Sequence, residues 1–372
     1  MKNQILLYSN TRKSSDIFYF AGVSMHDDFY CFSLDGKKCA LVSPLEIGRV
    51  RRNSKLDVIF DYSEVCSQMP KRVPRNYFEA IVFILKRNKV RSLIVPEDFP
   101  VGVFADLVER GFKVDICQGD FFVERQVKSK SELRQIQKAN DVASVCFQMA
   151  EETLRKSEIR RDALYYKGEI LTSEYLRSEI EKLAISLGAD ALDTVAACGN
   201  QACDPHEVGH GIITPHSLIV FDIFPRLRES GYFGDMTRTF LKGEPSEKQI
   251  ALVECVMKAQ KIAMSKIRMG RNGADVHNSV ADFFEKNNYK TKLIKGFWNG
   301  FFHSTGHGLG LDVHESPSLS VRDCILECGN VVTVEPGLYY RGIGGCRIED
   351  NVVVTCNGYK LLSKYHYNWI ID

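Results

Sequence analysis

The hydrophobic pattern changes near residue 125 and divides the chain into two predicted domains. Before that point, short apolar runs at 57–60, 92–95 and 113–117 are separated by helical patterns near 77–88 and 101–110. Residues 29–34 and 39–43 flank the dipeptide Asp35-Gly36, which predicts a β-hairpin. Alternating strands and helices are typical of a layered domain. We therefore predict an α/β domain over residues 1–125.

The pattern after residue 125 begins with a long amphipathic helix. Ser129 and Glu132 match a capping box, and apolar residues follow at helical spacing from Leu133 to Leu154. Further helices are expected at about 173–187, 246–267 and 274–287. Strands are expected at 218–222, 235–241, 331–335 and 347–355. We therefore predict a second, α+β domain over residues 126–372.

Composition narrows the class of protein without indicating its chemistry. The 372 residues carry 49 Lys and Arg against 47 Asp and Glu, so a net charge of +2 favours no nucleic-acid partner. No apolar run of about 18 residues occurs, so we expect no membrane span, and the first residues do not resemble a signal peptide. Twelve cysteines without a CxxC pair indicate reduced, mostly buried thiols. We expect a cytoplasmic protein.

Four acidic residues border the predicted strands of the second domain. They are Asp222, Asp235, Glu335 and Glu349. An ionised carboxylate beside a packed sheet is costly unless it is paired or bound to a metal. Side chains alternate along a strand, so Thr237 shares a side with Asp235, and Arg347 with Glu349. A hydroxyl and a guanidinium are thus expected next to the acids.

A segment rich in histidine and glycine lies between these acids. His303, His307 and His314 stand among glycines that allow the backbone to approach a site closely. Four carboxylates and one imidazole would neutralise two divalent cations, and oxygen-rich sites favour Mn²⁺, Fe²⁺, Co²⁺ or Mg²⁺. Two such ions can share a hydroxide and polarise a carbonyl, as in hydrolases. Any one acid alone is more simply a solvated turn residue, but the joint pattern predicts a metal site.

A second metal motif is rejected. Residues 206–210 read His-Glu-Val-Gly-His, which matches the H-E-x-x-H pattern of zinc peptidases. That pattern requires a helix, so that both histidines share one face. Pro205, Gly209 and Gly211 oppose a helix there. We therefore expect an irregular loop.

The acidic and histidine segments together resemble a known family. The segments VFD…GYFGDMTRTF, HSTGHGLGLDVHE, VTVEPGLYY and GCRIEDNVVVT resemble, in this order, the metal-site motifs of the pita-bread (M24-type) metallopeptidases. The resemblance is to the branch of Xaa-Pro aminopeptidases and prolidases and covers most of residues 126–372. Residues 1–125 are similar to the creatinase-type N-terminal domain of that branch. The resemblance implies a C-terminal pita-bread domain preceded by a smaller α/β domain.

The resemblance also implies roles for individual residues. Asp235 and Glu349 would bridge two metal ions, Asp222 would bind one ion, and His307 with Glu335 the other. Glu335 would also handle the proton of the attacking water. The resemblance places four more side chains in the active site: His303 as a substrate-binding residue, and His206, His314 and Arg347 as catalytic residues.

The implied activity is hydrolysis of the Xaa-Pro bond at the N-terminus of peptides, as in aminopeptidase P. The implied cofactors are two divalent ions, Mn²⁺ first, with Co²⁺, Fe²⁺ or Zn²⁺ as alternatives, and the implied assembly is a homodimer. A prolidase restricted to Xaa-Pro dipeptides and a non-catalytic binding protein on the same scaffold stay open. Phe224-Pro225 departs from the family's usual D-x-G turn after Asp222, and the 13-residue interval to Asp235 is slightly long. These departures leave the substrate preference open.

Overall fold

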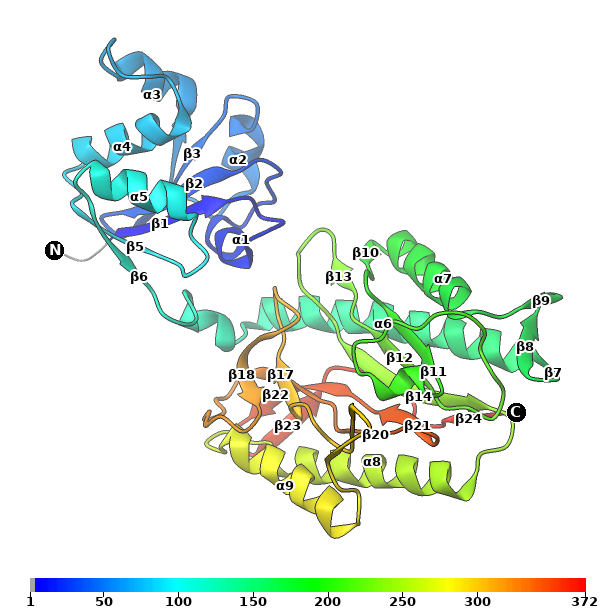
Figure 1. The fold of residues 1–372 in the computed structure, drawn as a ribbon. Coiled ribbons are helices and arrows are strands. Elements are labelled where there is room, and N and C mark those ends of the chain that lie inside the picture. Colours follow the sequence, from blue (N-terminus) through cyan, green and yellow to red (C-terminus); the bar gives the residue numbers. More distant parts are fainter. Residues whose placement is uncertain (1–3) are drawn as a thin grey trace. The chain divides into compact units, whose positions relative to one another are not determined.

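The computed structural model describes residues 4–372, which form two compact units, one ending at Val123 and the other beginning at Glu124. The first unit is built on one sheet with the strand order β4-β3-β2-β1-β5-β6 (Figure 1). Its strands are β1 (Gln4–Ser9), β2 (Phe29–Leu34), β3 (Lys37–Val42), β4 (Val58–Asp61), β5 (Ser92–Val95) and β6 (Lys113–Ile116). Its helices are α1 (Ser15–Ala21), α2 (Ile47–Asn53), α3 (Tyr62–Gln68), α4 (Tyr77–Arg87) and α5 (Val101–Glu109).

Helices cover both faces of this sheet. Leu6 and Leu7 are neighbours on β1 and point into different clusters of buried side chains, as alternation along a strand requires. The cluster around Leu6 includes residues of α3, α4 and α5, and the cluster around Leu7 includes residues of α1 and α2. The first unit is therefore a three-layer α/β sandwich.

Most predicted elements of the first unit are confirmed. β2 and β3 pair as a hairpin, and Asp35 and Gly36 turn the chain with φ of 50° and 82°. The strands β4, β5 and β6 and the helices α4 and α5 lie where the pattern placed them. The helices α1, α2 and α3 were not predicted. Each has only seven residues, too few for a helical period to be recognised.

The second unit places two main sheets between two pairs of helices. Figure 1 shows α6 (Lys130–Lys156) and α7 (Ser173–Ser186) on one side, and α8 (Glu247–Lys266) and α9 (Gly273–Lys286) on the other. One sheet has the order β11-β12-β14-β24 and the other β18-β17-β19-β22-β23. The first packs against α6 and α7 and the second against α8 and α9, each through its own buried cluster.

The bounds of the remaining elements are as follows. The strands are β7 (Glu158–Arg160), β8 (Ala163–Tyr166), β9 (Glu169–Ile170), β10 (Ala189–Asp190), β11 (Val195–Cys198), β12 (Ile219–Ile223), β13 (Arg226–Leu227), β14 (Met236–Lys242), β15 (Lys292–Ile294), β16 (Phe297–Asn299), β17 (Gly306–Gly308), β18 (Glu315–Leu319), β19 (Val331–Val334), β20 (Gly337–Tyr340), β21 (Gly344–Arg347), β22 (Asp350–Thr355), β23 (Gly358–Leu361) and β24 (Ile370–Ile371). Two short 3₁₀ helices are η1 (Val123–Gln126) and η2 (Gln201–Cys203).

The four predicted helices of the second unit are confirmed, together with the capping residues expected at the start of two of them. Ser129 and Glu132 form a complete capping box at α6, and Ser246 and Gln249 form one at α8. The helix α7 ends before Gly188, whose φ is 83°. These boundaries depend on local hydrogen bonds at the helix ends, which is why the sequence could locate them.

The prediction of one continuous strand over 347–355 is wrong. The strand β21 ends at Arg347 and pairs with β20, whereas β22 begins at Asp350 and pairs with β19. Between them the backbone N–H of Glu349 donates to the carbonyl of Thr237, 3.0 Å away. The apolar pattern continues through the break because both halves are buried, although they join different sheets.

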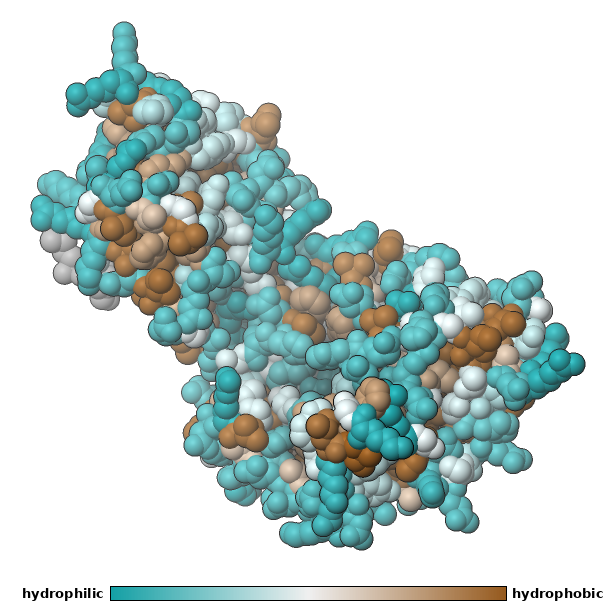
Figure 2. Space-filling model, in the orientation of Figure 1, coloured by the Kyte–Doolittle hydropathy of each residue, from teal (hydrophilic) through white to brown (hydrophobic). Residues whose placement is uncertain are grey.

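A hairpin that the pattern did not reveal precedes the histidine segment. The strands β15 and β16 pair, and Gly300 and Tyr339 exchange backbone hydrogen bonds of 2.9 and 3.2 Å. Its apolar side chains Leu293 and Trp298 are exposed at 59% and 53%. Figure 2 shows hydrophobic residues at the surface over this hairpin. The bonds between Gly300 and Tyr339 fix where the chain enters the histidine segment.

Within residues 4–372, the helices are all too short or too polar to cross a bilayer. The twelve cysteines lie in the described part of the chain as free thiols, and most are buried. The prediction that most of them are buried is confirmed.

Two exposed cysteines are expected to form a disulfide under mild oxidation. The Sγ atoms of Cys328 and Cys356 lie 3.8 Å apart, and the neighbouring Gly329 N–H donates to the Val354 carbonyl. Hydrogen peroxide would take one hydrogen from each thiol, form the S–S bond and leave water. The closed loop, 28 residues in sequence separation, predicts up to about 3–4 kcal/mol of stabilisation. Intact mass and urea unfolding would measure both effects. Cys328→Ser is the control, and two free thiols after treatment would contradict the prediction.

Candidate metal centre

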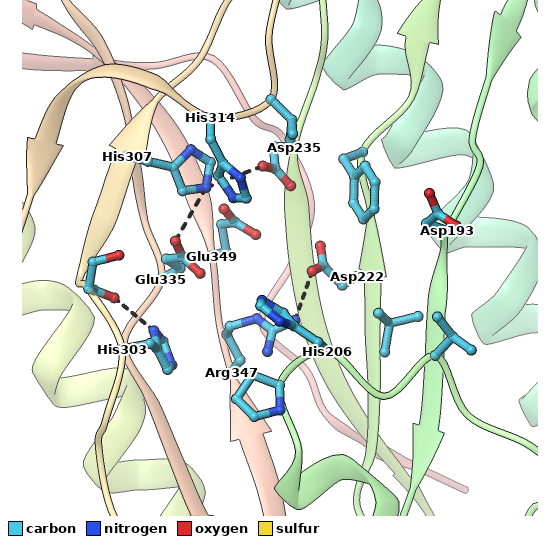
Figure 3. Close-up of a pocket in the computed structure, with 16 residues that line it drawn as sticks. Asp193, His206, Asp222, Asp235, His303, His307, His314, Glu335, Arg347 and Glu349 are labelled. Atoms are coloured by element: carbon cyan, nitrogen blue, oxygen red, sulfur yellow. Dashed lines mark hydrogen bonds and ion pairs between the residues drawn. The ribbon is translucent and has the colours of Figure 1, made fainter. Parts of the chain in front are cut away.

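The structure gathers every predicted site residue around one cavity of about 570 Å³ in the second unit. These residues are His206, Asp222, Asp235, His303, His307, His314, Glu335, Arg347 and Glu349. They come from six separate segments of the chain, and Figure 3 shows the four carboxylates facing one another in the middle of the group. The sheets therefore bring together side chains that are up to 143 residues apart in sequence (349 − 206).

Strand ends position the acidic residues. Asp222 lies on β12, opposite Thr237 of β14, and Asp235 lies just before β14. Glu335 directly follows β19, and Glu349 lies in the break between β21 and β22. Asp222 and Asp235 thus belong to the sheet of β12 and β14, and Glu335 and Glu349 lie next to strands of the other main sheet. The geometry of the site therefore depends on how the two sheets pack together.

Three side chains lie close enough to share a cation. Single ligand atoms of Asp235, His307 and Glu349 all lie within 4.8 Å of one another. The His307 Nε2 lies 3.7 Å from Asp235 Oδ2 and 3.4 Å from Glu335 Oε1. The other ring nitrogen, Nδ1, donates to the Gly308 carbonyl at 3.1 Å. In this tautomer Nε2 carries a lone pair and faces the carboxylate oxygens of Asp235 and Glu335. A cation needs such a group of lone-pair donors.

Burial raises the pKa of three of these acids. Burial and then the charge of Glu349 raise the pKa of Asp235 well above its usual range. Burial and then Glu335 do the same to the pKa of Glu349, and burial raises the pKa of Glu335 to about 7. Within the described residues, the buried Oδ1 of Asp222 has no hydrogen-bond partner. Crowded carboxylates with a free buried oxygen fit divalent cations, which would offset their repulsion.

Arg347 and Thr237 donate hydrogen bonds to two of the carboxylates. The Thr237 hydroxyl donates to Glu349 at 2.8 Å, and the Arg347 guanidinium donates to Asp222 at 2.8 Å. Burial alone would lower the pKa of Arg347, but Tyr339 and Asp222 raise it well above its usual value. Thr237 therefore contacts Glu349 rather than Asp235, and Arg347 contacts Asp222 rather than Glu349. A hydroxyl and a guanidinium do lie next to two of the acids, but these are not the acids two residues away in sequence.

Tyr339 is a site residue that the sequence did not reveal. Its buried hydroxyl accepts a hydrogen bond from Arg347 at 3.1 Å and lies 2.9 Å from His303 Nε2. His303 Nδ1 donates to the Ser304 carbonyl at 2.7 Å. Burial, together with Arg347, lowers the pKa of His303 to about 3, so this ring is neutral. Both nitrogens of His303 are thus used by the protein, which positions the ring rather than leaving it a free donor.

The other two histidines are more accessible. The His314 ring meets the His307 ring edge to face at 4.2 Å between centroids, and burial followed by His307 lowers its pKa. His206 is exposed on the loop after η2, and Figure 3 shows it beside Arg347. That loop is not helical, and Gly209 within it has a φ of 89°. The rejection of the H-E-x-x-H motif is confirmed.

A glycine permits the close packing around His307. A Cβ atom on Gly306 would lie 1.9 Å from the carbonyl oxygen of Thr333 on the neighbouring strand β19. No side chain fits there without moving backbone. The expectation that glycines of this segment allow close backbone approach is therefore confirmed at Gly306.

Residues 134–356 match the sequence model of metallopeptidase family M24. The chain belongs to this family. Among its relatives is the Xaa-Pro dipeptidase of Pyrococcus furiosus, 30% identical over 361 residues that cover 95% of this chain and 92% of the relative. The family resemblance expected from the acidic and histidine motifs is confirmed, and this metallopeptidase is an enzyme rather than a binding protein on the scaffold.

Solved structures confirm the fold of this M24 peptidase. The prolidase from Pyrococcus furiosus superposes with a TM-score of 0.80 at 27% identity, covering 98% of this chain and 97% of that one. The X-Pro aminopeptidase from Thermotoga maritima gives a TM-score of 0.82 at 21% identity, with 99% and 97% covered. The predicted pita-bread domain with its preceding α/β domain is therefore correct.

Proposed function

We propose that this M24 peptidase hydrolyses the Xaa-Pro bond at the N-terminus of peptides. The observation that supports this proposal most directly is the group Asp235, His307 and Glu349, whose ligand atoms lie within 4.8 Å of one another. The names of relatives, Xaa-Pro dipeptidase and X-Pro aminopeptidase, support the choice of bond. A preference for dipeptides is the second candidate, because the 30% identical relative is named a dipeptidase.

In this proposal the four carboxylates and His307 would hold two divalent cations, with Mn²⁺ as the preferred metal. Bound there, they would supply a hydroxide nucleophile and polarise the reacting carbonyl. Asp235 and Glu349 would contact both ions, Asp222 one, and His307 with Glu335 the other. The homodimer and the cytoplasmic location implied by the resemblance stay predictions.

The remaining side chains bind, orient and move protons. Glu335 would accept the proton of the attacking water at its carboxylate. His314, exposed and neutral because its pKa is lowered, would donate one N–H to the reacting carbonyl. Arg347 keeps Asp222 in place through its 2.8 Å hydrogen bond, and Tyr339 joins Arg347 to His303. His206, on its loop, would close over the substrate.

The test is hydrolysis of Xaa-Pro dipeptides and of longer Xaa-Pro-Yaa peptides after loading with Mn²⁺. Cleavage of both supports the aminopeptidase, and cleavage of the dipeptides alone supports the dipeptidase. Xaa-Ala peptides are the matched control for the proline requirement. A metal-loaded protein that cleaves neither proline series would contradict the proposal and point to the changed turn at Phe224-Pro225.

A further inference from the structure

One acidic residue of the cavity has no part in the proposed metal centre. Asp193 lines the same cavity as the four carboxylates, is exposed, and forms no hydrogen bond or ion pair with other residues in 4–372. Figure 3 shows it set apart from Asp235, Glu349 and Glu335. Its φ of 61° is a left-handed conformation, which aspartate tolerates better than most side chains. Its carboxylate is therefore available to a ligand.

The cavity wall next to Asp193 is apolar. Val195, Val208 and Phe224 line the cavity, and the register of β11 and β12 places Val195 opposite Asp222. Asp193 lies two residues before Val195, a backbone separation of at most about 7 Å. An occupant that reaches from the metal centre to Asp193 thus passes an apolar wall before it meets a negative charge.

We propose that Asp193 selects substrates whose N-terminal residue is arginine or lysine. This inference rests on the proposed function. These two side chains combine an apolar stem with a cationic head, which matches the apolar wall followed by a carboxylate. The stem would contact Val195 and Phe224, and the head would pair with Asp193.

In an Xaa-Pro dipeptide, the N-terminal side chain is the one side chain that can offer Asp193 a cation. Proline carries no charge on its ring, so only the N-terminal residue can place a cationic side chain in the cavity. The free α-amino group is two bonds from the reacting carbonyl and stays beside the metal-centre carboxylates. His303 lies on the opposite side of those carboxylates from Asp193 (Figure 3), which leaves that side for the proline.

The experiment compares kcat/KM for Arg-Pro, Lys-Pro, norleucine-Pro and Glu-Pro at low and high salt. The wild type should prefer Arg-Pro over norleucine-Pro by about fivefold, the upper range for a partly solvated ion pair, and less at high salt. Asp193→Asn should bring that ratio to about one and leave norleucine-Pro unchanged. Asp193→Lys should favour Glu-Pro. Asp35→Asn is the matched control, because Asp35 is exposed with a φ of 50° and lies in the first unit.

A ratio that Asp193→Asn does not change would overturn the inference, and so would an equal loss for all four dipeptides. Failure of the proposed function gives a different result. If Arg-Ala and norleucine-Ala are cleaved as well as the proline series, the proline requirement is wrong, but the ratio still tests Asp193. If nothing is cleaved, the dissociation constants of Arg-Pro and norleucine-Pro, measured by calorimetry, still test the preference for a cationic side chain.

Discussion

Replacing Asp235 by Asn should remove bound metal and activity, and at the same time make the metal-free protein more stable. Asp235 is only 4% exposed, and burial with the charges of Glu349, Asp222 and Glu335 raises its pKa. The neutral amide keeps the size of the side chain and removes one of these like charges. We expect a gain of about 1–2 kcal/mol in the free energy of unfolding without metal, the size of a typical stabilising substitution.

Metal binding should change in the opposite direction. An amide cannot replace a bridging carboxylate, so affinity should fall by more than the 10–100-fold typical of outer contacts, and turnover by about a thousandfold or more. Metal analysis after desalting, hydrolysis of an Xaa-Pro peptide and urea unfolding in chelator measure the three effects. Glu349→Gln should behave in the same way, because Glu349 is equally buried and its pKa is also raised.

The pH dependence of the free energy of unfolding tests why Asp235→Asn is more stable. A carboxyl whose pKa is raised on folding costs stability above its unfolded pKa, and this cost disappears as the pH falls below that value. The advantage of Asp235→Asn should therefore be largest at neutral pH and vanish in acid. Full metal content and activity in the variant would contradict the dimetal proposal. A variant that is less stable without metal would contradict the account of charge crowding.

The elements that the sequence predicted depend on local signals. The capping boxes of α6 and α8 and the Asp35-Gly36 turn lie within a few residues, so they could be recognised without the fold. The break between Arg347 and Asp350 could not, because it depends on which sheet each half joins. The hairpin β15–β16 escaped prediction because its exposed apolar side chains do not alternate with polar ones.

The same division holds for the site. That Asp222, Asp235, Glu335 and Glu349 belong to one site could be predicted, because charged residues at the ends of apolar strands need a partner or a metal. Their partners could not, because Arg347 reaches Asp222 from a strand 125 residues further along the chain. Tyr339 and Asp193 carry no local pattern at all. Tyr339 resembles any buried aromatic until the structure places its hydroxyl against Arg347 and His303. Asp193 resembles any turn aspartate until the structure places it at the cavity.

Replacing Asp350 by Ala should destabilise the second unit strongly and leave the metal centre nearly intact. Asp350 follows Glu349 in the chain but is paired and only 1% exposed. Its Oδ1 accepts hydrogen bonds from Arg238 at 2.8 Å and Ser363 at 2.6 Å. Its Oδ2 accepts from Gln260 at 2.9 Å and Tyr367 at 2.8 Å. The adjacent carboxylates of Glu349 and Asp350 are thus both buried but in different surroundings. Glu349 lies among other acidic side chains, whereas Asp350 is surrounded by hydrogen-bond donors.

Loss of Asp350 leaves the guanidinium of Arg238, itself 2% exposed, as a buried charge without its anion. Breaking such a pair typically costs about 3–5 kcal/mol, which would lower Tm by about 6–20 °C in a unit of this size. Arg238→Met in the same chain removes the unpaired charge and should restore part of the loss. Thermal unfolding of the two single variants and the double variant measures this coupling, and metal content per folded molecule should stay at the wild-type value. If the double variant is as unstable as the sum of the two single variants, the hydrogen bonds to the other three donors, rather than the ion pair, account for the stability.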